Sequence, residues 1–265
     1  RARRRAGGRG QAPDAVAELV EITRRGADAP YSAGERRRIG ELVSEVEARA
    51  GEPPAPYLDD PRLLGDWAVR HVLDGGGPGR PAGGPFRYSR LGRLLFPTTG
   101  LYQNILAGGR VVNHLRFRLC SLLPGSVTLC GSFQPASDGD FEQALASWTR
   151  RKGVAPPDPA AWRQQLSATN TIAARFERPR LSLGRGRVTL CLGPSLSRAV
   201  VLLDTSYLDD RLRIGRNREG ARFVCVRVPS APGAGSTAES QIAGGWKAVA
   251  ERRPLSPGAL LGWVA

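Results

Sequence analysis

Few residues in this sequence have the types and spacing that catalytic chemistry requires. The two histidines, His71 and His114, both lie in strand-like segments. Neither is close in sequence to a serine, cysteine or carboxylate motif that would mark a nucleophile with its base. We therefore expect structural roles for both histidines, and we expect that the protein is not an enzyme.

The cysteines and glycine clusters do not form a recognisable metal, redox or nucleotide site either. No two cysteines form a CxxC pair, so neither a zinc site nor a disulfide framework is indicated. The segment Gly184-Arg185-Gly186 lacks the third glycine and the following helix of a dinucleotide-binding loop, and is predicted to be a turn. No metal site is expected. The four cysteines are Cys120, Cys130, Cys191 and Cys225.

The net charge is strongly positive, and arginine supplies it. Lys and Arg total 39 against 24 Asp and Glu, which gives a formal charge of +15, yet only Lys152 and Lys247 are lysines. This composition fits nucleic-acid binding, attachment to an anionic membrane surface, or a GC-rich genome that encodes Arg in place of Lys. The arginines are spread along the chain, and no aromatic pair typical of RNA-binding sheets lies among them. Nucleic-acid binding is therefore disfavoured.

The first residues form a basic segment without acidic side chains. Residues 1–12 include five arginines and no Asp or Glu, and the sequence contains no Met. This composition is typical of the end of an organelle transit peptide and equally of a disordered basic arm. We interpret residues 1–13 as a leader of one of these two kinds.

Two helices are predicted within residues 14–51. Asp14 stands in the position of an N-cap, and apolar residues follow it at helical spacing. Ser32 and Glu35 have the spacing of a capping box, and an apolar stripe follows them until Gly51. We expect this helix pair to pack on a larger body.

After Pro61 the apolar pattern changes from the period of a helix to the period of a strand. Apolar and polar residues alternate from Val111 to Leu119, as in a half-buried antiparallel strand. About eight such segments within residues 62–228 predict a barrel or a sandwich. The other strand candidates are Trp67–Leu73, Val127–Phe133, Thr171–Phe176, Arg187–Leu192, Ala199–Leu203, Leu208–Ile214 and Arg222–Val228.

Two stretches depart from the strand pattern. Residues 135–167 contain a helix-like set of Phe141, Leu145 and Trp148 and a proline cluster, which indicates an insertion between strands. Residues 229–265 are rich in Ala, Pro, Gly and Ser, which predicts a tail that is mobile alone and orders against a partner.

Two motifs are more specific than these patterns. Gly65-Asp66-Trp67 stands where the helical pattern ends and the first strand begins. A Gly-x-Trp in this place resembles the opening strand of lipocalin-type barrels, where the indole plugs the closed end. The second motif is LDTSYLDDRLRIGR at residues 203–216, followed by RFVCVR at residues 222–227.

The second motif resembles the closing segment of the plastid lipid-associated proteins, also called plastid fibrillins. The resemblance covers about residues 14–228. It departs at Arg70-His71, where the family usually has Tyr-Thr, at the long insertion, and at Asn217, which replaces a usual glycine. The other shared features, in the family's order, are the helix pair, Leu64-Gly65-Asp66-Trp67, a turn at Tyr102-Gln103-Asn104-Ile105 and a strand start at Val111-Val112-Asn113.

This resemblance implies a fold and a function. The implied fold is mainly β, a lipocalin-like antiparallel β-barrel with an N-terminal helix pair. The implied function is non-enzymatic binding or organisation of isoprenoid quinones, carotenoids, fatty acids or other lipids. The implied location is the chloroplast, on thylakoids or plastoglobules or in the stroma. The anionic surface of these membranes is then an expected partner, because the positive charge of the protein strengthens that contact. A bound isoprenoid or lipid is the expected ligand, and no other cofactor is implied.

The resemblance also associates Tyr207, Asp209 and Arg213 with a polar contact to the ligand. The residues themselves leave other roles open. Asp209 and Arg213 also fit a salt bridge or a turn cap, and Tyr207 fits a pocket mouth or a strand end.

Three further residues are expected to close one end of the barrel without touching a ligand. Trp67 and Arg227 are predicted to stack as an arginine on an indole face, which stabilises by about 0.5 to 2 kcal/mol. Gly65 is expected to permit the tight backbone conformation at the start of the first strand.

An alternative function comes from the tail. Residues 229–265 carry Trp246 and Trp263, which a soluble carrier has little reason to keep. The alternative is a structural subunit that docks on a larger thylakoid membrane complex, with a barrel filled by its own side chains.

Overall fold

The computed structural model describes most of the chain between residues 14 and 228. The described residues are 14–26, 29–51, 56–73, 94–152, 160, 163, 166, 169–184, 188–191, 200–217 and 220–228. The predicted leader at 1–13 and the predicted tail at 229–265 lie outside them, and the domain boundaries stay predictions.

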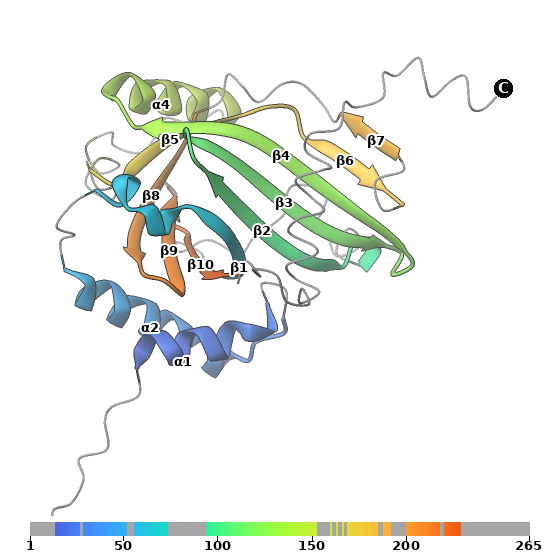
Figure 1. The fold of residues 1–265 in the computed structure, drawn as a ribbon, viewed down its shortest axis with the longest axis horizontal. Helices are drawn as coiled ribbons and strands as arrows, with labels where there is room; N and C mark the ends of the chain where they lie inside the picture. Colours follow the sequence, from blue (N-terminus) through green and yellow to red (C-terminus); the bar gives the residue numbers. More distant parts are fainter. Residues whose placement is uncertain are drawn as a thin grey trace, which may run out of the picture.

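Eight antiparallel strands close into a barrel, which confirms the mainly-β prediction (Figure 1). The ring runs β3-β2-β1-β10-β9-β8-β5-β4, and β4 pairs back with β3. Closure leaves no free sheet edge around the ring. The barrel strands are β1 (Gly65–Leu73), β2 (Thr98–Leu106), β3 (Arg110–Leu119), β4 (Leu123–Pro135), β5 (Thr171–Phe176), β8 (Val200–Leu208), β9 (Leu212–Asn217) and β10 (Arg222–Arg227).

The long strand β4 has two partners on one edge. Its second part pairs with β5, from Gly131 to Pro135, whereas Gly125 to Thr128 pair with β6 (Arg180–Leu183). Strand β7 (Val188–Cys191) then pairs with β6. On its other edge β4 pairs with β3 along the whole of that strand. The β3–β4 hairpin therefore continues past the ring as an arm.

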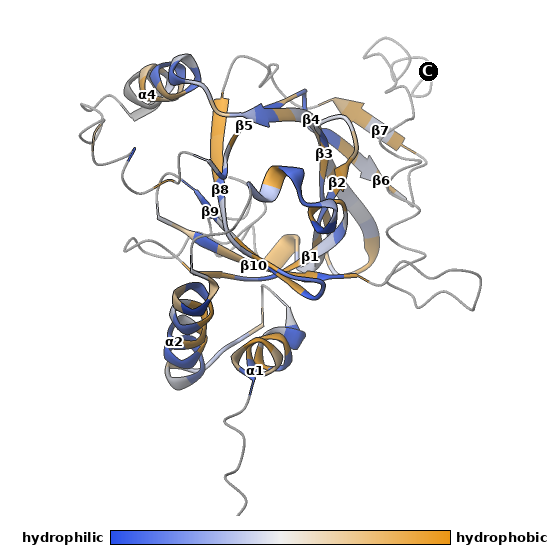
Figure 2. Ribbon diagram, turned by 60° about the vertical axis from the view of Figure 1, so that its left-hand side comes forward, coloured by the Kyte–Doolittle hydropathy of each residue, from blue (hydrophilic) through white to orange (hydrophobic). Residues whose placement is uncertain are grey.

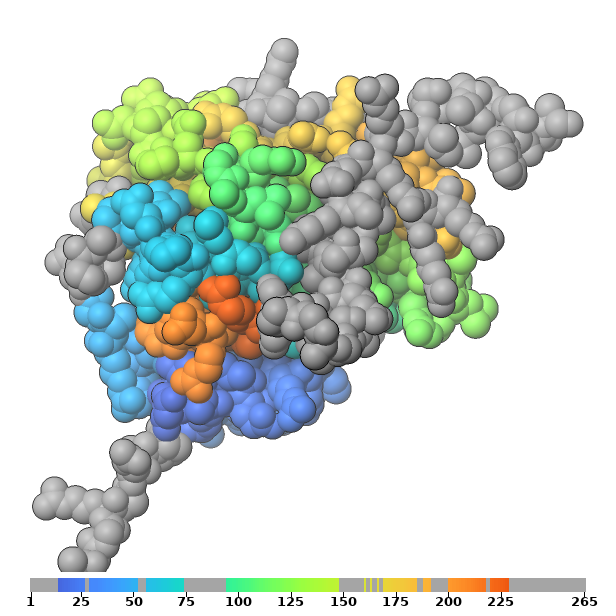
Figure 3. All heavy atoms as spheres, in the orientation of Figure 1, coloured from blue at the N-terminus to red at the C-terminus, as the bar shows by residue number. Residues whose placement is uncertain are grey.

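The predicted helix pair forms and covers the outer face of β9 and β10 (Figure 3). Helix α1 (Ala15–Ile22) begins at Asp14, whose carboxylate accepts from the Val16 N–H at 3.1 Å, and the 3₁₀ helix η1 (Thr23–Arg25) follows it. Helix α2 (Ala33–Ala50) has the predicted capping box of Ser32 and Glu35. The apolar stripes of both helices pack on Leu212, Ile214 and Val224.

A further helix lies on another part of the barrel, within the predicted insertion. Helix α4 (Asp138–Lys152) packs Phe141 and Leu145 on Ala173 and Leu202 of β5 and β8. The helix predicted from the apolar spacing in this stretch is therefore confirmed.

Two sequence predictions are wrong. The predicted strand Leu208–Ile214 is the end of β8, a turn at residues 209–211 and the start of β9. The Asp209 carboxylate causes the break, because it accepts the N–H groups of Arg211 and Leu212 at 2.7 and 2.6 Å. The predicted turn Tyr102–Ile105 lies inside β2, where all four residues pair with β1 and β3.

The two ends of the barrel differ. At one end the 3₁₀ helices η2 (Tyr57–Asp59) and η3 (Pro61–Leu63) cross the opening, as Figure 2 shows. Their side chains Tyr57, Leu58 and Leu63 pack with Trp67 inside the barrel. We call this the sealed end. The tip of the β3–β4 arm lies at the opposite end.

Candidate functional site

The sealed end is built around the Trp67 indole. This side chain is fully buried, and its Nε1–H donates to the Leu63 carbonyl at 2.9 Å. The Arg227 guanidinium lies 4.2 Å from the indole centroid, so the predicted stacking is present. Arg227 also donates to the carbonyls of Leu64 and Asp210, each at 2.9 Å. These bonds hold the guanidinium on the ring, while burial lowers the pKa of Arg227.

Gly65 permits this arrangement. Its φ is +129°, a conformation that other residues rarely adopt. A Cβ at this position would lie 2.7 Å from the Arg227 Nη1 atom. The residue must therefore be glycine for the guanidinium to reach the indole.

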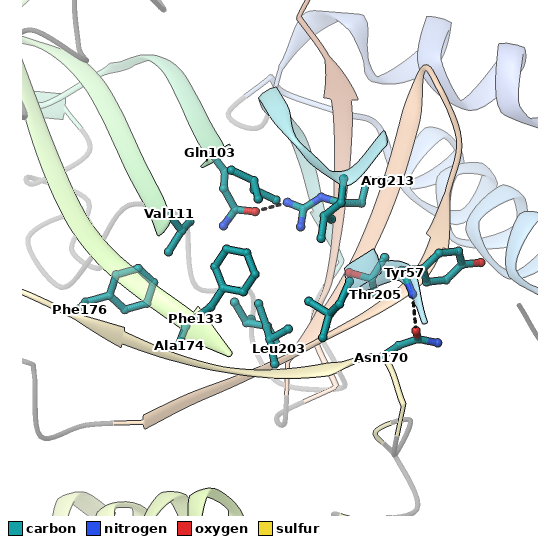
Figure 4. A pocket seen from close by; sticks show the side chains of 14 residues that line it. Tyr57, Gln103, Val111, Phe133, Asn170, Ala174, Phe176, Leu203, Thr205 and Arg213 are labelled. Atoms are coloured by element: carbon teal, nitrogen blue, oxygen red, sulfur yellow. Dashed lines mark hydrogen bonds between the residues drawn. The ribbon is translucent and has the colours of Figure 1, made fainter. Parts of the chain in front are cut away.

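A second guanidinium, that of Arg213, points into the barrel from β9. Its Nη2 donates to the Gln103 Oε1 on β2, and its Cζ lies 5.6 Å from the Trp67 ring (Figure 4). The side chain is 7% exposed, and its Nε has no hydrogen-bond partner. Arg213 is therefore a buried cation with an unsatisfied donor, which is costly unless something compensates it.

The groups that Arg213 contacts through hydrogen bonds are neutral. Gln103 Nε2 donates to Asn113 Oδ1 at 2.9 Å, so two amides form the polar neighbourhood. The Cys225 thiol lies 3.7 Å from Arg213 Nη2, and burial raises the pKa of that thiol. Among the described residues no carboxylate lies within 4 Å of Arg213 as an ion-pair partner. The interior thus carries positive charge without a matching anion from the described chain.

Apolar side chains form the wall beside this polar group. Together they enclose a cavity of about 20 Å³, enough for about one water molecule (Figure 4). The lining residues are Tyr57, Leu58, Leu63, Gln103, Ile105, Val111, Phe133, Asn170, Ile172, Ala174, Phe176, Leu203, Thr205 and Arg213.

The three predicted ligand residues do not lie together. Tyr207 packs on the helix side of the barrel wall, with the apolar cluster of α1 and α2. Its hydroxyl donates to Asp209 Oδ2 at 2.9 Å, and burial together with this bond raises the pKa of Tyr207. Asp209 also orders the β8–β9 turn through its contacts to the backbone. Of the three residues, Arg213 alone lines the cavity.

Both histidines lie on the outer face of the wall. The His71 ring meets Tyr31 edge to face at 4.9 Å, and burial lowers the pKa of His71. His114 Nδ1 lies 3.0 Å from the Thr128 hydroxyl, and burial lowers the pKa of His114 to about 3. Neither histidine lines the cavity.

Sequence reasoning missed the partners of Arg213. Gln103 and Asn113 face each other across the β2–β3 ladder. A signal existed for Asn113, which stands among apolar residues in the inward phase of the alternation along β3. No such signal marks Gln103, because the sequence pattern predicts a turn at Tyr102–Ile105.

The described residues include no group of three His, Cys, Asp or Glu side chains that could hold a metal ion. No helix among them has the length and apolarity needed to cross a membrane.

The closed barrel, its sealed end and the inward guanidinium of Arg213 define a class, that of small antiparallel barrels with polar groups inside an apolar wall. The sequence of the chain is also similar to that of a known protein. The chain is 23% identical over 209 residues to a probable plastid-lipid-associated protein, number 8, chloroplastic, of Arabidopsis thaliana. The match covers 79% of this chain and 69% of that relative. It supports assignment of the chain to the plastid lipid-associated protein family. No family model matches the chain, and no solved structure matches it.

Proposed function

We propose that this protein binds an amphipathic small molecule of the lipid or isoprenoid class at a plastid membrane or plastoglobule, without catalysing a reaction. The polar end of the molecule, a carboxylate or another oxygen-bearing group, contacts Arg213. The apolar part lies along the wall that includes Val111, Phe133 and Phe176. Chloroplast location is proposed from the relative, whose name describes it as chloroplastic and plastid-lipid-associated.

The buried, incompletely bonded guanidinium of Arg213 is the observation that carries this proposal. An oxygen acceptor from a ligand would satisfy Nε and offset the positive charge. A mostly apolar cavity with a few polar groups, here including Gln103 and Arg213, is also the usual form of a small-molecule site. Tyr207 and Asp209 act on the site from outside the barrel, because they order the turn that precedes Arg213.

The size of the cavity sets a condition on this function. A space of about 20 Å³ holds about one water molecule and not a lipid tail. Binding therefore requires apolar side chains of the wall to move apart.

The test is mass spectrometry of an organic extract from the folded protein, purified gently from its source membranes. Arg213→Met keeps an unbranched apolar side chain beside Trp67 and removes the charge. Arg211→Met is the matched control, because Arg211 lies outside the barrel and pairs with Asp14 at 2.9 Å. We expect one enriched lipid or isoprenoid in the wild type and in Arg211→Met, and its loss in Arg213→Met. Tyr207→Ala and Asp209→Ala should weaken retention less than Arg213→Met.

Two results would contradict the proposal in different ways. If Arg213→Met retains the lipid in full, Arg213 does not contact the ligand. The absence of any enriched lipid from the wild type would exclude a carrier.

The small cavity favours a second candidate, a structural subunit of a larger thylakoid complex with a filled barrel. Limited proteolysis separates the two candidates. If residues 229–265 are cut rapidly in the isolated protein and protected in native membranes, the subunit is supported. Equal cutting in both samples would count against it.

A further inference from the structure

The tip of the β3–β4 arm presents leucine side chains to solvent. Leu122 is 84% exposed and Leu123 is 40% exposed in the turn that joins the two strands. Leu94 is 72% exposed and belongs to the segment beside this turn, because the Cys120 N–H donates to the Leu95 carbonyl at 2.8 Å. We call Leu94, Leu122 and Leu123 the hairpin tip. Single exposed leucines are common on protein surfaces, whereas several gathered at one projecting turn mark an interaction site.

The arm holds this tip in a fixed position. The β3–β4 ladder is unbroken from Arg110 and Ser132 to Leu119 and Leu123. The turn is tight, since the Leu122 N–H donates to the Leu119 carbonyl at 3.1 Å and both central residues have positive φ. In Figure 1 the arm reaches the end of the molecule opposite α4, away from the sealed end. The leucines are thus presented by a rigid element.

The charge around the tip has one sign. Residues 75–137 contain no Asp or Glu, and every charged side chain in this stretch is an arginine. In the part of β3 that leads to the turn these are Arg116 and Arg118, and Arg118, next to the turn, is exposed. An apolar tip with arginines behind it is complementary to an anionic lipid surface, where apolar groups enter the acyl region and guanidinium groups meet the phosphates.

The shape of the tip also favours a lipid surface over a protein partner. A stable protein interface buries roughly 800 Å² on each side and involves about twenty residues. A turn with two leucines and a third in the segment beside it offers far less. Insertion into a lipid interface needs only a few apolar side chains with electrostatic support.

We propose that the hairpin tip inserts into an anionic lipid surface, with Leu94 and Leu122 in the acyl region and Arg118 at the headgroups. This inference rests on the proposed lipid association and goes beyond it, because it names the face of the molecule that meets the membrane. The barrel then stands with its sealed end away from the lipid.

The first experiment is flotation of the full chain with vesicles of phosphatidylcholine and phosphatidylglycerol. The double variant Leu94→Asp/Leu122→Asp should float roughly tenfold less than the wild type. Leu64→Asp is the matched control, because Leu64 is 40% exposed and lies at the sealed end. It should float like the wild type. Vesicles of phosphatidylcholine alone should bind the wild type more weakly.

The second experiment reports insertion directly. An environment-sensitive fluorophore is placed at Leu122→Cys in a Cys120→Ser/Cys191→Ser background, which removes the two exposed native thiols. Its emission should shift to the blue when the mixed vesicles are added. The same label at Leu64→Cys should not shift.

Each contrary result has a separate meaning. Unchanged flotation of the double variant, with no shift at Leu122→Cys, would overturn the proposed insertion of the hairpin tip. Another face of the protein would then contact the lipid. If the wild type does not float, both the insertion of the hairpin tip and the membrane contact are overturned. Mass spectrometry of the extract from the purified protein would still test ligand binding in the barrel. Equal flotation with both vesicle types would overturn the role of charge. A concentration-dependent dimer of the wild type that the double variant fails to form would assign the tip to a second copy of the chain.

Discussion

At the scale of single residues, the sealed end depends on a glycine. Gly65→Ala should lower the free energy of unfolding by about 1 to 3 kcal/mol, because its positive φ disfavours any Cβ and the added atom would displace Arg227 from the indole. Urea denaturation measures the effect. Gly40→Ala in α2 is the control, since a Cβ there would make only ordinary contact with Leu73 at 3.9 Å. It should be neutral or stabilising. Equal stability of the two variants would contradict the proposed strain.

Another residue-scale prediction concerns pH. Burial lowers the pKa of His114 to about 3 from 6.5, so the folded state binds this proton less readily than the unfolded state. Stability is then fully present above pH 6.5 and falls as the pH drops from 6.5 toward 3. Between about pH 7.5 and about pH 5.5 we expect a loss of about 1.4 kcal/mol from this group. His71 contributes in the same direction, because burial lowers its pKa too.

Denaturation of the wild type and of His114→Gln at both pH values tests this prediction. The substitution should reduce the pH dependence, while His71→Gln should reduce it less. If the wild type and His114→Gln lose equal stability on acidification, another group is responsible.

Residue types alone predicted part of the site. The contact between Trp67 and Arg227 is predictable from the sequence. Trp67 lies near the start of the first barrel strand and Arg227 at the end of the last, and a guanidinium stacks readily on an indole face. The bond from Arg213 to Gln103 is not predictable in this way, because it joins residues far apart in sequence and depends on the inward phase of both strands. A register error of one residue would have turned either side chain to the outside.

At the scale of elements, Glu47 fastens α2 to the barrel. Its carboxylate accepts from Ser206 Oγ at 2.5 Å and from Arg216 Nε at 2.8 Å, and Arg222 lies 3.4 Å away. Burial alone would raise the pKa of Glu47, but these bonds outweigh it, so the pKa lies below the usual value. Stability from Glu47 is therefore present above about pH 4.5 and is lost as the pH falls further.

Glu47→Gln should cost about 1 to 3 kcal/mol, since it leaves two arginines without their anion. Hydrogen exchange should show faster opening of α2, whereas the barrel strands should keep most of their protection. Glu41→Gln, which removes exposed ion pairs on the same helix, should have little effect. An equal effect of both variants would mean that Glu47 does not fasten the helix.

The helices were predicted more reliably than the strands, for physical reasons. Caps and apolar stripes are local, so Asp14 and Ser32 marked true helix starts. Strand β2 was missed because the inward Gln103 breaks the apolar alternation that marks a strand. The β8–β9 turn was missed because its apolar residues continue across it, and only the side chain of Asp209 interrupts the backbone pairing.

At the scale of the whole molecule, charge should control membrane contact. The formal charge of +15 predicts attraction to anionic lipid, which dissolved salt screens. Flotation with phosphatidylglycerol vesicles should fall as salt rises from about 0.05 M to about 0.5 M. Flotation that does not change with salt concentration would show that apolar insertion alone holds the protein on the vesicle.

The place of β10 in the ring has a consequence for how the chain reaches its native state. This strand lies between β9 and β1, so the first barrel strand gains its second neighbour only when the last one arrives. Such non-local pairing makes folding slow, because loop closure must precede most of the stabilising contacts. Until then the edge of β1 and the apolar interior stay open to other chains. A chain that emerges in sequence order, from a ribosome or across an organelle envelope, would therefore need protection by chaperones until Arg227 is available.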